Sequence, residues 1–171
     1  QFLTGYIEDL RRAGVPDGTI DIAISNCVVN LAPDKRLVLK AVYDSLAVGG
    51  EFYFSDVYCD RRLPEDVRQD KVLWGECLSG ALYVEDFKRL CREVGFTDPR
   101  VLSTRPMSID NAAIADKLGN AQFSSILFRL FKLPNLETLC EDYGQVAVYK
   151  GTITEHKLGD GSFVHSNLAV V

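Results

Sequence analysis

Residues 19–58 alternate between strand-like and helix-like patterns, and this alternation limits the chain to few folds. Residues 19–31, TIDIAISNCVVNL, have an apolar, β-branched core that predicts a buried strand. Residues 32–50 place apolar side chains at helical spacing between a Pro-Asp pair that should start a helix and a Gly-Gly pair that should end it. Residues 50–58, GEFYFSDVY, predict the next strand. Strand, helix and strand in this order predict a βαβ unit and a parallel sheet.

Further helices and an antiparallel pair of strands are predicted on either side of this unit. Before it, residues 2–14 predict the end of a strand followed by a short helix. After it come two helices, a short strand and two alternating strands, over residues 63–82, 83–96, 99–105, 124–133 and 142–153. We therefore expect an α/β domain over residues 1–133 and the start of another region over residues 134–171.

The chain has no glycine-rich phosphate loop. A doubly wound sheet normally opens with a strand and a glycine-rich turn whose backbone approaches the cofactor. This sequence contains neither GxGxxG nor a P-loop, and it begins as if in the third βα step of such a fold. We therefore predict that the chain is the C-terminal part of a longer protein and holds the later strands of the sheet.

Charge and hydropathy exclude several classes of partner. The net charge is −5 and no Lys/Arg-rich stripe is present, so binding of nucleic acid through its phosphates is not expected. No apolar run approaches the roughly 20 residues that span a bilayer, and the N-terminus lacks a signal-peptide layout. These features predict a cytoplasmic monomer with neither a nucleic-acid nor a membrane partner.

Polar side chains follow the predicted strands at the edge where α/β sheets bind ligands. Glu8 follows the first strand end, and the amides of Asn26 and Asn30 follow the next strand. These groups could meet a ribose or an adenine edge. An equally ordinary interpretation makes Asn26 a cap of the following turn and Glu8 a first-turn acid that suits the helix dipole.

The five cysteines predict reduced thiols, because their number is odd and no two form a CxxC pair. Cys91 lies on the apolar side of a helix and should be a core residue, which is the usual role of a buried cysteine. Cys27 could line a site but is expected to be structural, and Cys59, in a charged loop, is expected to be exposed. The remaining two, Cys77 and Cys140, are the candidate site residues.

Cys77 and Cys140 have surroundings that suit a soft ligand. Glu76 precedes Cys77, and glycines at 75 and 80 leave space around it. The loop of Cys140 is acidic, which would raise the pKa of its thiol unless a soft cation replaced the proton. Two thiols with only two histidines in the chain favour a thiophilic centre over zinc or magnesium. Two ligands leave such a site open, so a third should lie elsewhere.

Several stretches together resemble one enzyme family. GYIEDL, SNCVVNLAPDK, GGEFYFSDVY, RQDKVLWGECLSGALY and FRLFKL occur in this order over residues 2–151 and resemble arsenite methyltransferases, which methylate trivalent arsenic with S-adenosylmethionine. The resemblance implies an α/β, Rossmann-like class I methyltransferase sheet, here partial, with an antiparallel C-terminal pair. It also implies arsenic detoxification, with arsenite or its thiol conjugates and a thiol reductant as partners, and it makes residues 134–171 the start of an arsenic-binding region and a tail.

The resemblance assigns roles to individual residues. Cys77 and Cys140 match family cysteines that bind arsenic(III) as thiolates, and a further ligand lies upstream of this chain. Ile7 and Glu8 would meet the nucleoside part of S-adenosylmethionine, with Asn26, Cys27 and Val28 lining its other side. Ser79 stands where the family more commonly has glycine.

The implied chemistry needs no general base, because thiolate-bound arsenic(III) keeps a lone pair that can attack the sulfonium methyl directly. The protein's contribution would be orientation. Since the methionine-binding loop is absent, the 171 residues alone are expected to be inactive. Two alternatives stay open at this point: a methyltransferase-like domain for another small molecule with both cysteines in its core, and a non-catalytic thiol module that sequesters a soft ion.

Overall fold

The computed structural model describes residues 2–138, and strands and helices alternate along them. In chain order the elements are β1 (Ile20–Asn26), a 3-10 helix (Val29–Leu31), α1 (Lys35–Ser45), β2 (Leu46–Cys59), α2 (Glu65–Arg68), α3 (Lys71–Gly75), β3 (Leu82–Tyr83), α4 (Val84–Val94), β4 (Arg100–Pro106), α5 (Ala112–Leu118) and β5 (Phe123–Phe131). The chain divides into two units, 1–136 and 137–171, and the description that follows concerns the first.

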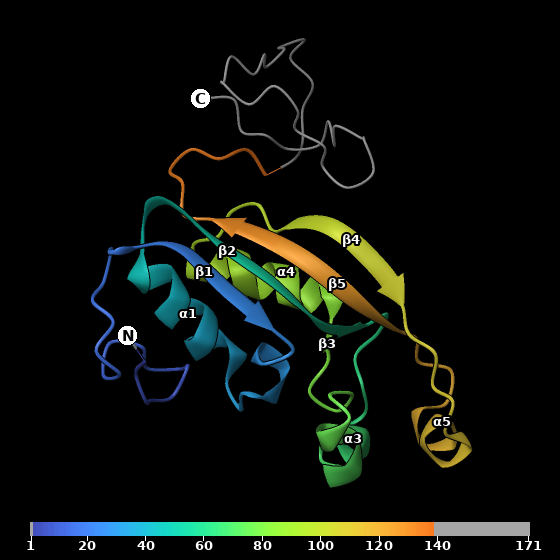
Figure 1. The fold of residues 1–171 in the computed structure, drawn as a ribbon. Helices are drawn as coiled ribbons and strands as arrows, with labels where there is room; N and C mark the ends of the chain where they lie inside the picture. The colour runs from blue at the N-terminus through green and yellow to red at the C-terminus, as the bar shows by residue number, and fades with distance from the viewer. Residues whose placement is uncertain (1, 139–171) are drawn as a thin grey trace, which may run out of the picture. The chain divides into compact units, whose positions relative to one another are not determined.

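The strands form one mixed sheet in the order β1-β2-β5-β4, with the two-residue β3 also paired to β2 (Figure 1). β1 and β3 run parallel to β2, so the predicted βαβ unit is confirmed. β5 runs antiparallel to both β2 and β4. The prediction for residues 124–133 is thus confirmed as a strand, whereas its expected partner, residues 142–153, lies outside the described residues.

Helices α1 and α4 pack against the same face of the sheet and bury an aromatic core (Figure 1). In that core the ring of Phe54 contacts those of Phe87 and Phe128, with centroids 5.8 and 6.0 Å apart. On the other face Ile22 and Ile24 of β1 are 58% and 77% exposed. The prediction of a strand buried on both sides is therefore wrong for the described residues, because helices cover one face only.

Helix α1 begins where predicted and ends earlier. The carboxylate of Asp34 accepts the backbone N–H groups of Arg36 and Leu37 at 2.9 and 3.1 Å, which caps the helix. The predicted end at the glycine pair is wrong, because the helix stops at Ser45. The next residue, Leu46, is fully buried and pairs with β1, so burial of this side chain draws residues 46–50 into the strand.

Three other segments differ from the sequence prediction. Residues 2–14 form turns instead of a strand and a helix, and the Asp9 carboxylate there caps a turn by accepting the N–H of Arg12 at 3.0 Å. Residues 63–82 hold two short helices rather than one long one. Helix α5 was not predicted, although the Asn111 side chain caps it by accepting two backbone N–H groups.

No helix among residues 2–138 is long and apolar enough to cross a bilayer.

Candidate functional site

The carboxyl end of β1 carries an exposed thiol. The strand ends at Asn26, and the next residue, Cys27, has a left-handed backbone with φ of 53°. The Cys27 N–H donates to the carbonyl of Ser55 on β2 at 2.9 Å, and the Ser55 hydroxyl donates to the Asn26 side-chain oxygen. These bonds fix the turn to the neighbouring strand, so Cys27 lies at a defined place on the sheet edge.

A second thiol lies on the turn that follows α3. The carboxylate of Asp70 caps the start of this helix. At its end the Leu78 N–H reaches back to the carbonyl of Leu73 at 2.9 Å, and the half-buried Cys77 has φ of 60°. Glycine usually occupies such a position after a helix, because left-handed backbone is costly for other residues. Figure 1 shows α3 beyond the end of the sheet at which β1 stops.

Cys27 and Cys77 interact electrostatically although 50 positions separate them in the sequence. Burial raises the pKa of the Cys77 thiol most, followed by the negative charge of Asp56 and that of Cys27, with a smaller effect of Glu76. Burial and Asp56 also raise the pKa of Cys27. The backbone agrees with this, because Asn26 pairs with Ser55 beside Asp56, and Gly80, after Cys77, lies against Asn30, after Cys27. The segments that carry the two thiols therefore meet at the carboxyl edge of the sheet.

Asp56 is fully buried at 0% exposure and directly follows Ser55, the partner of Asn26 across the sheet. One carboxylate oxygen accepts the backbone N–H of Asn30 at 2.9 Å and the other accepts the N–H of Val57 at 2.9 Å. Burial raises the pKa of Asp56, and the hydrogen bonds and the Lys35 ammonium group oppose that rise. The sequence analysis did not single out Asp56. The available signal was a carboxylate inside the largely apolar run of β2, directly before Val57.

The structure does not bring Ile7 and Glu8 to this edge. No strand forms before them, Ile7 packs against the main core, and Glu8 lines a shallow pocket beside Lys40 and Asp44 of α1. The expectation that Glu8 follows a strand end is therefore wrong. Val28, by contrast, is exposed next to Cys27.

Two expectations about the other cysteines are also wrong. Cys59 is 2% exposed rather than free in a charged loop, because it ends β2 opposite Phe123 and packs in a second core cluster. Cys27 is exposed rather than structural. Cys91 is fully buried in the main core, as predicted. Cys140 lies outside the described residues.

The site is a two-thiol site in the part of the chain that the structure describes. No three His, Cys, Asp or Glu side chains within residues 2–138 lie close enough together to hold a metal ion. Within the described residues the candidate site therefore presents two accessible thiols and no set of metal ligands.

Alkylation by iodoacetamide should distinguish these cysteines in the native chain. We expect Cys27 and Cys77 to react first, whereas Cys59 and Cys91 react only after unfolding. The thiolate is the nucleophile and the thiols of Cys27 and Cys77 have raised pKa values, so their alkylation rates at neutral pH should be below that of free cysteine and rise as the pH increases. Mass mapping of the digested chain measures each site, and urea-unfolded chain is the control. Equal native rates at Cys91 and Cys27 would contradict this placement.

Comparison with known proteins gives the chain's relatives. The family model described as a methyltransferase domain matches residues 1–95. An arsenite methyltransferase of Aquipseudomonas alcaligenes is 57% identical over 152 residues, which is 89% of this chain and 44% of that protein. The arsenite methyltransferase of Homo sapiens is 46% identical, over 91% of this chain and 41% of that one. The chain thus spans less than half the length of these relatives.

A solved structure shares the fold. The crystal structure of an arsenic(III) S-adenosylmethionine methyltransferase from Chlamydomonas reinhardtii aligns with a TM-score of 0.80 and 60% identity, over 88% of this chain and 50% of that one. A Bacillus protein that is 14% identical aligns with a TM-score of 0.53, which adds support for the fold alone.

Proposed function

The chain belongs to the methyltransferase-domain family, and from this premise we propose that its protein transfers a methyl group from S-adenosylmethionine to trivalent arsenic. The observation that carries the proposal is the position of Cys27 and Cys77 on two segments that meet at the carboxyl edge of the sheet, where α/β folds bind their ligands. The named relatives and the solved Chlamydomonas structure support the choice of arsenic.

The two thiols can bind arsenous acid without a change of oxidation state. Each As–S bond forms as one As–OH bond breaks, and the thiol proton leaves with that hydroxyl as water. Because neutral thiols suffice, the raised pKa values of Cys27 and Cys77 are no obstacle. Cys140 remains a proposed further ligand on the strength of the family resemblance, and the third ligand would otherwise come from outside this chain.

The protein's part in the transfer is orientation. S-adenosylmethionine, when bound, would supply a methyl group from its positively charged sulfur: an As–C bond would form from the arsenic lone pair as the C–S bond broke, and S-adenosylhomocysteine would leave. Asn26 and Val28 are exposed on either side of Cys27, so we propose that these two residues line the cofactor, whereas Cys27, which the resemblance also places there, binds arsenic instead. Ile7 and Glu8 stay a prediction from the resemblance, since the structure does not bring them to this edge.

The proposed setting is the cytoplasm, where thiols stay reduced. A thiol reductant would return Cys27 and Cys77 to the free form after oxidation, and methylation would serve arsenic detoxification. We propose a monomer, because both thiols come from one chain.

The proposal is tested by arsenite binding and by methyl transfer. The 171-residue chain should bind one arsenite with loss of two free thiols, measured by titration calorimetry and thiol counting. Without a glycine-rich loop it should transfer no methyl group. A fusion to the upstream half of the Aquipseudomonas relative should transfer labelled methyl groups from S-adenosylmethionine to arsenite.

The possible outcomes separate the alternatives. Binding by the chain without turnover in the fusion would indicate a sequestering thiol module. Absence of arsenite binding would leave a methyltransferase for another small molecule and remove the assignment of both cysteines.

A further inference from the structure

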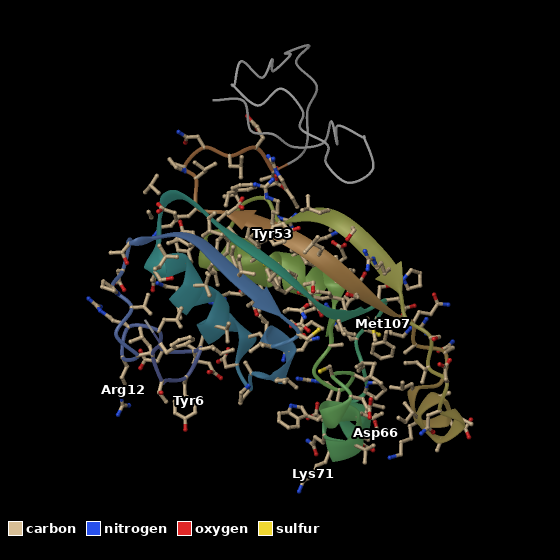
Figure 2. All side chains as sticks on the ribbon, viewed as in Figure 1. Tyr6, Arg12, Tyr53, Asp66, Lys71 and Met107 are labelled. Atoms are coloured by element: carbon tan, nitrogen blue, oxygen red, sulfur yellow. The ribbon has the colours of Figure 1, made fainter. Side chains whose placement is uncertain are left out.

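A cavity of about 210 Å³ lies between the start of α1 and the segment that runs from α2 to β3. Figure 2 shows the two short helices of that segment, with Asp66 of α2 and Lys71 of α3 labelled. Of the described residues, neither Cys27 nor Cys77 lines the cavity, so it is distinct from the thiol site. Pockets for drug-sized ligands begin at about 300 Å³, so this one suits a smaller molecule.

The Lys35 ammonium group lines this cavity without an ion pair. The side chain is half-buried, and its Nζ donates to the carbonyl of Ala32 at 3.2 Å, which is its one polar contact within residues 2–138. An ammonium group carries three donors, so two remain available. Burial lowers the pKa of Lys35, and an anion in the cavity would offset that effect.

The charges that line the cavity suit a monoanion. Lys35 and Arg68 are positive and Glu65 is negative, which leaves a net charge of one positive unit. Arg68 donates to the Glu65 carboxylate at 3.2 Å, so among these three side chains Lys35 is the one whose charge is not paired. One carboxylate balances this charge, whereas a phosphate, which carries nearly two negative charges at neutral pH, exceeds it.

Ser79 adds a buried hydroxyl group that lacks a hydrogen-bond partner. The residue lines the cavity and is 4% exposed, and its Oγ has no donor or acceptor in reach among residues 2–138. Buried polar side chains are nearly always paired, so an unpaired hydroxyl beside a cavity indicates a ligand that pairs with it. A carboxylate oxygen would accept a bond from this hydroxyl as well as from the Lys35 ammonium group.

Trp74 gives the cavity an apolar wall. The residue is 51% exposed and is the single tryptophan of the sequence. Pro33, Ala81 and Leu82 continue this apolar lining. Small-molecule sites commonly combine such apolar walls with a few polar groups that fix the orientation of the ligand.

We propose that this cavity binds a small organic acid, with its carboxylate at Lys35 and Ser79 and its apolar part against Trp74. The carboxylate would form a charge-assisted hydrogen bond with Lys35, which is stronger than a neutral one. The site goes beyond the proposed function and does not depend on it, because it uses neither of the two thiols.

Tryptophan fluorescence of the 171-residue chain tests the proposal, since Trp74 alone produces that signal. The probe is cyclohexanecarboxylate, a monoanion on an apolar ring that does not absorb where tryptophan is excited. We expect a saturable change of fluorescence, with an affinity at least about tenfold higher than that of the neutral cyclohexanecarboxamide. Acetate, which lacks the ring, should bind at least about tenfold more weakly than the probe. Inorganic phosphate should also bind more weakly.

Two variants test the polar contacts. Lys35→Gln should lower the affinity for cyclohexanecarboxylate at least about tenfold, and Ser79→Ala should lower it about threefold. Ser79→Ala should also melt at the wild-type temperature or above, because the hydroxyl that it removes has no partner among the described residues. If either variant does not fold, as judged by circular dichroism, Lys35→Met or Ser79→Gly replaces it.

Lys71→Gln is the matched control, because it removes a lysine charge three positions before Trp74. The Lys71 side chain does not line the cavity and points away from the sheet (Figure 2). Its variant should therefore bind cyclohexanecarboxylate as wild type does. A loss as large as that of Lys35→Gln would show a general charge effect and would contradict a specific contact with Lys35.

The remaining outcomes also decide the proposal. Absence of a saturable signal in wild type would overturn it. Equal affinity for the neutral amide would indicate an apolar groove without an anion site, and tighter binding of phosphate would indicate a different class of anion; either would overturn the proposal. Wild-type affinity in Lys35→Gln or in Ser79→Ala would do the same. The thiols enter none of these measurements, so the proposed function is tested separately.

Discussion

Replacement of Cys27 or Cys77 by serine is expected to lower the affinity for arsenite by at least about 100-fold, since the second sulfur binds at the high effective concentration set by the first. A serine oxygen does not substitute, because arsenic(III) prefers soft sulfur ligands. Methyl transfer by the fusion should fall below detection in both variants, while the affinity for S-adenosylmethionine stays close to wild type in Cys77→Ser. Titration calorimetry measures both affinities. Normal turnover in either variant would contradict the thiol-pair assignment.

Two further variants complete this series. Cys59→Ala removes a buried thiol from the second core cluster and should bind arsenite as wild type does. Cys140→Ser decides the role of the remaining candidate. A loss of arsenite affinity as large as that of Cys77→Ser would make Cys140 an arsenic ligand. An unchanged affinity would exclude Cys140 and leave Cys27 as the second ligand beside Cys77.

Gly80→Ala is expected to weaken arsenite binding by at least about tenfold through a purely steric effect. A Cβ at this position would lie 2.2 Å from the carbonyl oxygen and 3.1 Å from the carbonyl carbon of Asn30. Both are backbone atoms and cannot rotate away, so the segment with Cys77 has to move. Calorimetric titration with arsenite measures the loss, and circular dichroism should show that the fold persists.

Gly75→Ala is the matched control, five positions earlier in the same segment. A Cβ there meets nothing within 4 Å, and the residue is helical. Alanine should leave arsenite binding unchanged and raise the free energy of unfolding by up to about 1 kcal/mol, because glycine is a poor helix former. Equal losses of arsenite affinity in Gly75→Ala and Gly80→Ala would contradict a steric effect that is specific to Gly80.

Much of the fold could be predicted from local patterns. The α/β, Rossmann-like class I methyltransferase sheet is confirmed by the structure and by the TM-score of 0.80 to the Chlamydomonas enzyme. Helix α4 spans Val84–Val94 and ends at Gly95 as predicted, since amphipathic spacing and a terminal glycine are both local signals. The turns at residues 2–14 and the early end of α1 depend on tertiary burial, which periodicity does not report.

The roles of the site residues stay predictions, and the arrangement of these residues is non-local. Cys77 was found through its neighbours in the sequence, and it lies at the candidate site. Cys27 was taken as structural, since an apolar strand surrounds it in the sequence and nothing local shows that the strand ends one residue earlier. Its proximity to Cys77 follows from the packing of Gly80 on Asn30, which only the structure reveals.

The left-handed backbone at Cys27 and Cys77 makes both positions prone to replacement by glycine during evolution. Each cysteine holds a conformation that costs about 1 kcal/mol or more for a residue with a Cβ and almost nothing for glycine. Cysteine codons become glycine codons by one base change, so each thiol is a single mutation away from a more stable chain that lacks it. Selection for fold stability alone would erase the pair.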